Sequence, residues 1–200
     1  VIKAVEEGTV VPINNVLMTI ENTDNKCFWL TNFLETILSQ VWYPITVASL
    51  SREVKVNLKE YFDLTSDGGL LNFGLHDFGF RGASSWESAG IGGAAHLINF
   101  LGTDTVVAME VAVNHYNANL DNLAFSVAAT EHSVMTALGK NGEEQVVENL
   151  LNEYPTGILS VVSDSYDIYN FVSNIVGTKF KDRILACDGV FVVRPDSISP

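Results

Sequence analysis

The chain has little positive charge, few cysteines and no long hydrophobic run. Eleven Lys and Arg side chains stand against 24 Asp and Glu, which leaves a formal net charge of −13. This shortage of cations argues against nucleic acid or an anionic membrane as a partner, because both bind basic surfaces. No apolar stretch approaches the roughly 20 residues that span a bilayer. The first residues also lack the basic-then-apolar order of a signal peptide.

The two cysteines, Cys27 and Cys187, lie far apart in the sequence. They form no CxxC pair and no Cys/His spacing of the kind that a structural zinc ion requires. Two free thiols in a reducing cytoplasm are the simplest interpretation. We therefore expect a cytoplasmic protein with no metal held by its own ligands.

The composition is that of a folded domain. The chain has 200 residues, of which 47% are hydrophobic and 18% charged, enough for one domain with a real core. It has no low-complexity tract, internal repeat or obvious linker, so we expect a single domain over residues 1–200. The chain does not begin with Met, and we expect it to be a piece of a longer protein.

Strand-like and helix-like segments alternate along the chain. The patterns predict strands at 16–20, 45–48, 71–80, 125–128, 158–162 and 190–193. They predict helices at 28–42, 51–62, 84–97, 107–116, 143–154 and 166–176. Pro44 is expected to end the first helix and Ser51 to cap the second. The alternation is typical of an α/β fold with largely parallel strands, either open or closed into a barrel.

The glycines of segment 90–95 (GIGGAA) have the spacing of a dinucleotide-binding fingerprint. That motif must directly follow a strand and open a helix. Here it falls inside a helix that already begins at Ser84 or Ser85. We interpret the small side chains as a surface that lets the helix pack closely on the sheet.

Three polar clusters each follow an apolar segment. They are His76–Gly82, Ala129–Ser133 and Val193–Ser197. Side chains that follow parallel strands gather at the carboxyl edge of a sheet, where α/β proteins bind ligands. An aromatic ring, two arginines, a histidine and an aspartate from three such ends suit a flat ring together with an anionic group.

The first cluster leaves two interpretations open. Phe78 can stack on an aromatic ligand while Arg81 binds a carbonyl or phosphate oxygen. Alternatively, Phe78 belongs to the core and Arg81 pairs with Asp77 or Glu87. The acid Asp104, near another strand end, can accept a hydrogen bond from a substrate amide.

The other two clusters are equally open. His132 can be a general base, a phosphate ligand, a phosphoryl acceptor or a structural residue. Arg194 suits a phosphate and Asp196 suits ribose hydroxyls or a metal ion, but the two can also be a structural ion pair. Asp164 follows a strand and can accept a hydrogen bond from a substrate.

Six segments, in order, resemble the nicotinamide phosphoribosyltransferase family. They are 76–82 (HDFGFRG), 84–92 (SSWESAGIG), 102–105 (GTDT), 129–133 (ATEHS), 160–170 (SVVSDSYDIYN) and 194–197 (RPDS). The family's chains are well over twice as long, so the resemblance implies the central part of the catalytic domain. It also implies the irregular, half-open α/β barrel of the type II phosphoribosyltransferases.

The resemblance implies a pentosyl transfer in NAD salvage. Nicotinamide and 5-phosphoribosyl 1-pyrophosphate give nicotinamide mononucleotide and pyrophosphate, with Mg²⁺ on the pyrophosphate group. ATP hydrolysis is coupled to the reaction through a phosphorylated histidine. The family acts as a homodimer in which the partner subunit completes the site, so we expect the 200-residue piece alone to be inactive.

The resemblance also implies roles for residues that bind the base. Phe78 stacks on the nicotinamide ring, and Arg81 binds near the amide or the ribose phosphate. Asp104 accepts a hydrogen bond from the amide NH₂, which favours nicotinamide over the anionic nicotinate. The remaining residues expected to line the tunnel for the ring are Ser126, Val127 and Ala129.

Further implied roles concern the phosphoribosyl group. His132 matches the phosphorylated histidine, Arg194 and Asp196 hold the phosphoribosyl moiety, and Asp164 positions the ribose or its metal. The chain departs from the family pattern at Ile198, which stands where the family has glycine. Two alternatives stay open: a nicotinate phosphoribosyltransferase, or a catalytically inactive remnant that serves in binding or dimerisation.

Overall fold

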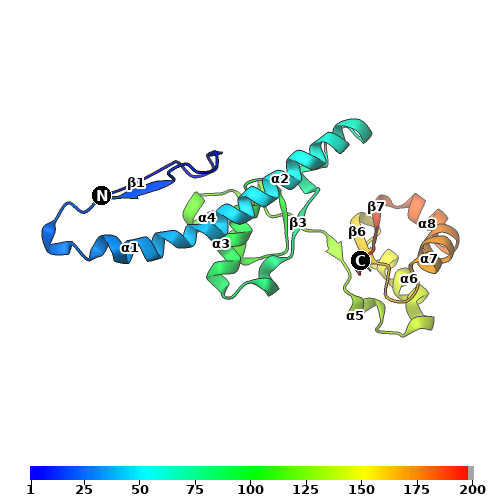
Figure 1. Ribbon diagram of the computed structural model, residues 1–200. Helices are drawn as coiled ribbons and strands as arrows, with labels where there is room; N and C mark the ends of the chain where they lie inside the picture. The colour runs from blue at the N-terminus through cyan, green and yellow to red at the C-terminus, as the bar shows by residue number, and fades with distance from the viewer. Residues whose placement is uncertain (198–200) are drawn as a thin grey trace. The chain divides into compact units, whose positions relative to one another are not determined.

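The computed structural model describes residues 1–197, which form two compact units (Figure 1). The first unit is Val1–Ser126, and the second begins at Val127. Ile198, the departure from the family pattern, lies outside the described residues. None of the helices within residues 1–197 is both long and apolar enough to cross a membrane.

The first unit is mainly helical and has two small pairs of strands. Its elements are β1 (Ile2–Ala4), β2 (Met18–Ile20), α1 (Leu30–Leu38), α2 (Trp42–Thr65), β3 (His76–Asp77), α3 (Trp86–His96), β4 (Gly102–Thr103) and α4 (Val107–Tyr116). Short 3₁₀ turns, η1 to η5, lie at 25–27, 39–41, 71–73, 79–82 and 120–122. β1 and β2 are antiparallel, whereas β3 and β4 are parallel, and Phe125 extends the second pair through a parallel bridge to Gly102.

The long helix α2 contradicts the predicted strand at 45–48, which lies inside the helix. The β-branched residues of that segment favour a strand, but the half-buried and buried positions recur every three or four residues, as on one helix face. They include Tyr43, Val47, Ser51 and Leu58. Pro44 does not end a helix, because it lies in the first turn of α2, where no backbone N–H is required.

Ser51 likewise does not cap a helix. It is buried in the middle of α2, and its hydroxyl donates to the carbonyl of Ala48 and accepts from the side chain of Asn99. Asn99 also donates to the Ala48 carbonyl at 2.9 Å. This polar network ties α2 to the segment that follows α3.

The small residues of α3 allow close packing, as predicted, but the neighbours are mainly other helices, and of the β3–β4 pair Asp77 comes close, at Gly93. A Cβ on Gly93 would lie 2.6 Å from the Cβ of Ala108 in α4, and one on Gly92 would lie 2.5 Å from the Tyr43 hydroxyl in α2. Ser85 caps the helix by accepting from the backbone N–H of Ser88. The fingerprint spacing therefore serves packing inside a helix.

Gly93→Ala should lower the free energy of unfolding of the intact protein by about 1–3 kcal/mol, because the added methyl overlaps Ala108. Urea unfolding measures the change. Gly82→Ala is the matched control, since nothing lies within 4 Å of the Cβ that it adds. Adding Ala108→Gly should restore part of the loss. Equal stabilities for the Gly93→Ala and Gly82→Ala proteins would contradict the packing argument.

The second unit is an α/β layer. Its elements are β5 (Ala128–Ala129), α5 (His132–Met135), α6 (Glu143–Glu153), β6 (Thr156–Val162), α7 (Ile168–Asn170), the π-helix η7 (Phe171–Lys179), α8 (Lys181–Ala186) and β7 (Asp188–Arg194), with a 3₁₀ turn η6 at Lys140–Gly142. The three strands form one parallel sheet in the order β5-β6-β7. Leu159 of the central strand pairs with Ala128 on one side and Phe191 on the other.

The core of the second unit lies around β6. The last four residues of this strand are buried, as expected for a central parallel strand whose neighbours cover it. The fully buried Val147 of α6 and Phe171 of the π-helix are part of its cluster. The residues that follow β6 therefore leave from the best-packed part of this unit.

The α/β class and the largely parallel strand pairing are confirmed. The described residues contain no closed barrel, so the half-open barrel stays a prediction. Helices at 107–116 and 143–154 are confirmed within one residue, and the strand at 158–162 lies inside β6. The predicted strand at 71–80 is extended only at β3, because 3₁₀ turns occupy both of its ends. Helix α8 has no counterpart in the prediction.

Candidate active site

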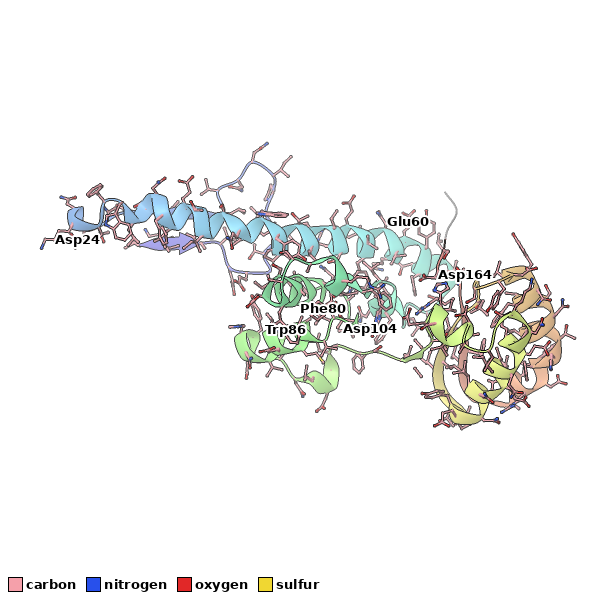
Figure 2. All side chains as sticks on the ribbon, turned by 90° about the horizontal axis from the view of Figure 1, so that it is seen from below. Asp24, Glu60, Phe80, Trp86, Asp104 and Asp164 are labelled. Carbon is pink, nitrogen blue, oxygen red and sulfur yellow. The ribbon has the colours of Figure 1, made fainter. Side chains whose placement is uncertain are left out.

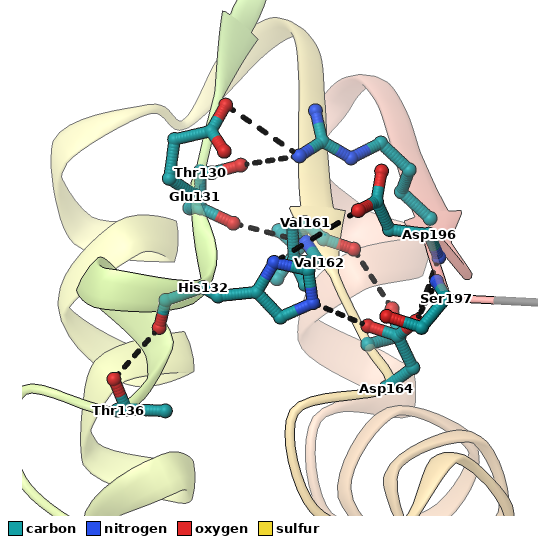
Figure 3. Close-up of polar contacts among 11 residues, drawn as sticks. Thr130, Glu131, His132, Thr136, Val161, Val162, Asp164, Asp196 and Ser197 are labelled. Carbon is teal, nitrogen blue, oxygen red and sulfur yellow. Dashed lines mark hydrogen bonds and ion pairs between the residues drawn. The ribbon is translucent and has the colours of Figure 1, made fainter.

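In the second unit, three side chains meet beyond the carboxyl ends of the parallel strands (Figure 3). His132 begins α5 after β5, Asp164 follows β6, and Asp196 follows β7. The Nε2 atom of His132 lies 3.0 Å from Oδ1 of Asp164, and its Nδ1 lies 3.9 Å from Oδ2 of Asp196. The prediction that these strand ends converge is therefore confirmed for this unit.

Asp164 is the most constrained member of this cluster. Its side chain is 9% exposed, and its Oδ2 accepts the backbone N–H groups of Asp196, at 2.8 Å, and Ser197. Burial alone would raise the pKa of this carboxyl. The hydrogen bonds from Ser197, Asp196 and His132 outweigh burial and hold the pKa of Asp164 below its ordinary value. Asp164 is therefore an anion over the whole physiological range.

Arg194 ends β7, and Pro195, which follows it, favours this extended geometry. Its Nη2 donates to the Thr130 carbonyl at 2.9 Å and lies 3.7 Å from Oε1 of Glu131. Its Nε is buried and has no hydrogen-bond partner among residues 1–197. Among residues 1–197 the ion-pair partner of Arg194 is thus Glu131, not Asp196. The contacts with Thr130 and Glu131 both use Nη2, which leaves the Nη1 donors for an anionic ligand.

Thr130 is a buried residue to which the sequence assigns no site role. Its hydroxyl accepts the N–H of Val162 at 2.9 Å, and its own N–H donates to the carbonyl of Ser160 at the same distance. It thereby carries the β5–β6 pairing one residue further, to the point where Glu131 and His132 leave the sheet. The only sequence signal for a structural role of Thr130 is its position between the strand at 125–128 and His132.

The donor set of this cluster does not fit a metal held by the protein alone. Within residues 1–197, no three His, Cys, Asp or Glu side chains gather in a way that could hold a metal ion. Both oxygens of Asp164 already accept hydrogen bonds from the chain. Asp196, with its side chain 54% exposed, is the carboxylate left open. Mg²⁺ commonly uses one or two carboxylates together with substrate phosphates, which a single open carboxylate allows.

In the first unit, a second polar cluster follows the β3–β4 pair. Asp104 comes directly after β4 (Figure 2), and its backbone N–H donates to the Asp77 carbonyl at 2.9 Å. The Ser126 hydroxyl donates to Oδ1 of Asp104, and Nε2 of His76 lies 3.4 Å from its Oδ2. The sequence indicates roles for Asp104 and Ser126, but not for His76. The alternation of a strand could have found it, because it shares a face with Phe78.

Phe78 and Arg81 both lie free of the core. Phe78 is 51% exposed, and its ring centroid lies 4.7 Å from that of His76. Arg81 is exposed in η4 and, among the described residues, makes no ion pair with Asp77 or Glu87. The alternative in which Phe78 is core and Arg81 is paired within the chain is therefore wrong for this unit.

The last two predicted tunnel residues are in the second unit. Val127 precedes β5 and is 43% exposed, and Ala129 ends β5 beside Ser160 of β6. Both residues lie beside the strand end that leads to His132. The tunnel that they are expected to line stays a prediction.

The second unit thus has the arrangement of an α/β protein whose charged groups gather at the carboxyl ends of parallel strands, where such folds commonly bind ligands. Comparison with known proteins identifies the family. The model of the "Nicotinate phosphoribosyltransferase (NAPRTase) family" matches residues 73–200. The chain belongs to this family.

Individual relatives match the chain along its length. Nicotinamide phosphoribosyltransferase of Xanthomonas campestris pv. campestris is 49% identical over 100% of the chain, which covers 43% of that protein. The proteins of the same name from Acinetobacter baylyi and Mycoplasma genitalium are 37% and 35% identical over 100% and 98% of the chain, covering 41% and 42% of their lengths. The chain therefore spans less than half the length of these relatives.

Asp164→Asn should lower the free energy of unfolding by about 1.5–3 kcal/mol at pH 7, because an amide cannot accept hydrogen bonds on both of its terminal atoms. Since the folded pKa of Asp164 lies below the ordinary value of 3.8, the contribution is full above that pH and disappears as the pH falls below it. Urea unfolding from pH 7 to pH 3 measures the difference.

Asp188→Asn is the matched control, because Asp188 is an exposed acid at the start of β7. It should change stability by less than about 0.5 kcal/mol. A deficit for Asp164→Asn that stayed constant down to pH 3, or that was no larger than that of the control, would contradict the assigned hydrogen bonds.

Proposed function

We propose that the intact protein transfers a phosphoribosyl group from 5-phosphoribosyl 1-pyrophosphate to nicotinamide, giving nicotinamide mononucleotide and pyrophosphate in NAD salvage. The observation that carries the proposal is the hydrogen-bonded cluster of His132, Asp164 and Asp196 beside Arg194, in a member of a phosphoribosyltransferase family. The names of three relatives support nicotinamide as the base. Residues 1–200 would be the central part of the catalytic barrel domain.

The cluster of the first unit would bind the base. The exposed face of Phe78 is free to stack on the nicotinamide ring, which orients a nucleophile that needs little chemical activation. Asp104, an acceptor, would take the amide NH₂ and would repel the carboxylate of nicotinate. Arg81, free of intrachain partners within the described residues, would bind near the amide or the ribose phosphate.

The cluster of the second unit would hold the phosphoribosyl group. As the bond to pyrophosphate breaks, positive charge develops at the anomeric carbon and negative charge on the leaving group. Arg194 has donors for phosphate oxygens, and the exposed carboxylate of Asp196 can accept from ribose hydroxyls. Asp164 would act by positioning His132 and the backbone at Asp196. Mg²⁺ would arrive bound to the pyrophosphate of the substrate.

His132 would couple ATP hydrolysis to the transfer. Asp164 accepts at Nε2 of the imidazole, so the neutral ring carries its proton there and has a lone pair at Nδ1. Nδ1 would attack the γ-phosphorus of ATP, forming the N–P bond as the bond to the ADP oxygen breaks. We propose that the protein acts in the cytoplasm as a homodimer and that the 200-residue piece alone is inactive.

Two rivals remain for experiment. A nicotinate phosphoribosyltransferase would use the same chemistry with the acid as its base, and the family name itself includes that activity. An inactive remnant would bind or dimerise without turnover. In that case, substitution of His132 or Asp196 would leave its biological effect unchanged.

Asp104→Asn in the intact protein should raise the ratio of kcat/KM for nicotinate to that for nicotinamide by about 10–100-fold, because the variant no longer repels a carboxylate. Steady-state assays with both bases measure the ratio. Asp121→Asn, which changes a surface acid of the same unit, should leave it unaltered. An unchanged ratio in Asp104→Asn would remove Asp104 from base selection.

Incubation of the intact protein with γ-³²P-ATP and Mg²⁺ should leave acid-labile label on His132. His132→Asn should lose the label and the stimulation of synthesis by ATP, whereas His115→Asn, on the exposed end of α4, should keep both. Label retained in His132→Asn would place the phosphorylated residue elsewhere.

A further inference from the structure

His76 stands between the two residues that the proposed function assigns to the base. Its Nε2 lies 3.4 Å from Oδ2 of Asp104, and its ring centroid lies 4.7 Å from that of Phe78 at an interplanar angle of 42°. This Nε2 is buried and has no hydrogen-bond partner within residues 1–197. Buried polar atoms rarely lack a partner, so this atom calls for an explanation.

The fold makes room for this imidazole. In the β3–β4 pair His76 lies opposite Gly102, and a Cβ at position 102 would lie 2.6 Å from Nδ1 of the His76 ring. Glycine therefore lets the ring lie against β4 and approach Asp104, two residues further along. The carbonyl of Gly102 is itself held by Nε2 of the buried His96 at 3.0 Å. The contact is thus built by three elements, β3, α3 and β4.

Asp104 is approached on both oxygens. The Ser126 hydroxyl donates to Oδ1 from the segment that bridges to Gly102, and His76 faces Oδ2. The backbone of Asp104 is fixed by its N–H donating to Asp77. A second donor, on Oδ2, would fix the orientation of this carboxylate. Contacts that are loose without ligand commonly tighten when the ligand binds.

We propose that His76 is a positioning residue for base selection. Its Nε2–H donates to Oδ2 of Asp104, and its ring packs against Phe78. One side chain thus aligns both the polar and the stacking contacts of the base. This inference rests on the proposed function. It predicts that loss of His76 weakens the preference for nicotinamide over nicotinate without affecting the phosphoribosyl donor.

The test uses the intact protein and four variants. His76→Leu should raise KM for nicotinamide about tenfold and lower the nicotinamide-to-nicotinate ratio of kcat/KM by a similar factor, with KM for the donor unchanged. His76→Gln, whose amide nitrogen can take the place of Nε2, should stay within about threefold of the unaltered protein. His76→Asn, whose shorter amide cannot reach Asp104, should resemble His76→Leu. His115→Gln is the neutral control.

A double-mutant cycle separates positioning from general damage. In the Asp104→Asn background, His76→Leu should change the base ratio by less than about twofold, because no carboxylate remains to be held. An equal effect in both backgrounds would overturn the proposal, and so would a base ratio in His76→Leu that matched the unaltered protein. If His76→Leu does not fold, the contrast between His76→Gln and His76→Asn decides the same point.

A spectroscopic readout keeps this inference apart from the proposed function. With ¹⁵N-histidine labelling, and His76 assigned by its loss in His76→Gln, the ring should show the tautomer with the proton on Nε2. Asp104→Asn should perturb that signal. A protein with no turnover on either base would contradict the proposed function, but a proton on Nε2 would still support the contact between His76 and Asp104. A proton on Nδ1 would overturn the positioning role of His76.

Discussion

One carboxylate organises the second unit. Asp164 follows the most buried strand of the sheet, and its two oxygens accept from two directions: the imidazole of His132 after β5, and the backbone of Asp196 and Ser197 after β7. The three strand ends are therefore tied together by one buried anion. The hydrogen bonds outweigh burial and keep the pKa of Asp164 low, so the carboxylate stays an acceptor. This acceptor fixes the tautomer and the orientation of His132.

The first unit repeats this logic with a different acid. Asp77 accepts from the Thr103 hydroxyl at 3.0 Å and the Gly79 N–H at 2.8 Å, and its carbonyl accepts the N–H of Asp104. These bonds fix the turns that present Phe78 and Asp104. In both units an acid next to a parallel strand end orients the residue expected to meet a substrate. Asp77 and Asp164 thus both accept hydrogen bonds from the backbone of the chain itself.

Where sequence and structure agree, the physical signal is local. Apolar spacing predicted α4 and α6, and the apolar run at 158–162 predicted β6. The strand expected at 45–48 fails because tertiary packing of a long helix overrides β-branched propensity. His76 and Thr130 received no site role from the sequence, because the roles of both depend on their cross-strand neighbours. The chemical roles of the site residues came from the family resemblance, because the positions of the side chains do not identify the substrate.

Product formation by the intact protein tests the proposed phosphoribosyl transfer most directly. The protein would receive 5-phosphoribosyl 1-pyrophosphate, Mg²⁺ and ATP, with nicotinamide and nicotinate in equal competition, and the mononucleotide products would be separated by chromatography. Nicotinamide mononucleotide should be the dominant product. Product mainly from nicotinate would contradict the role of Asp104, and product from neither base would contradict the proposed phosphoribosyl transfer itself.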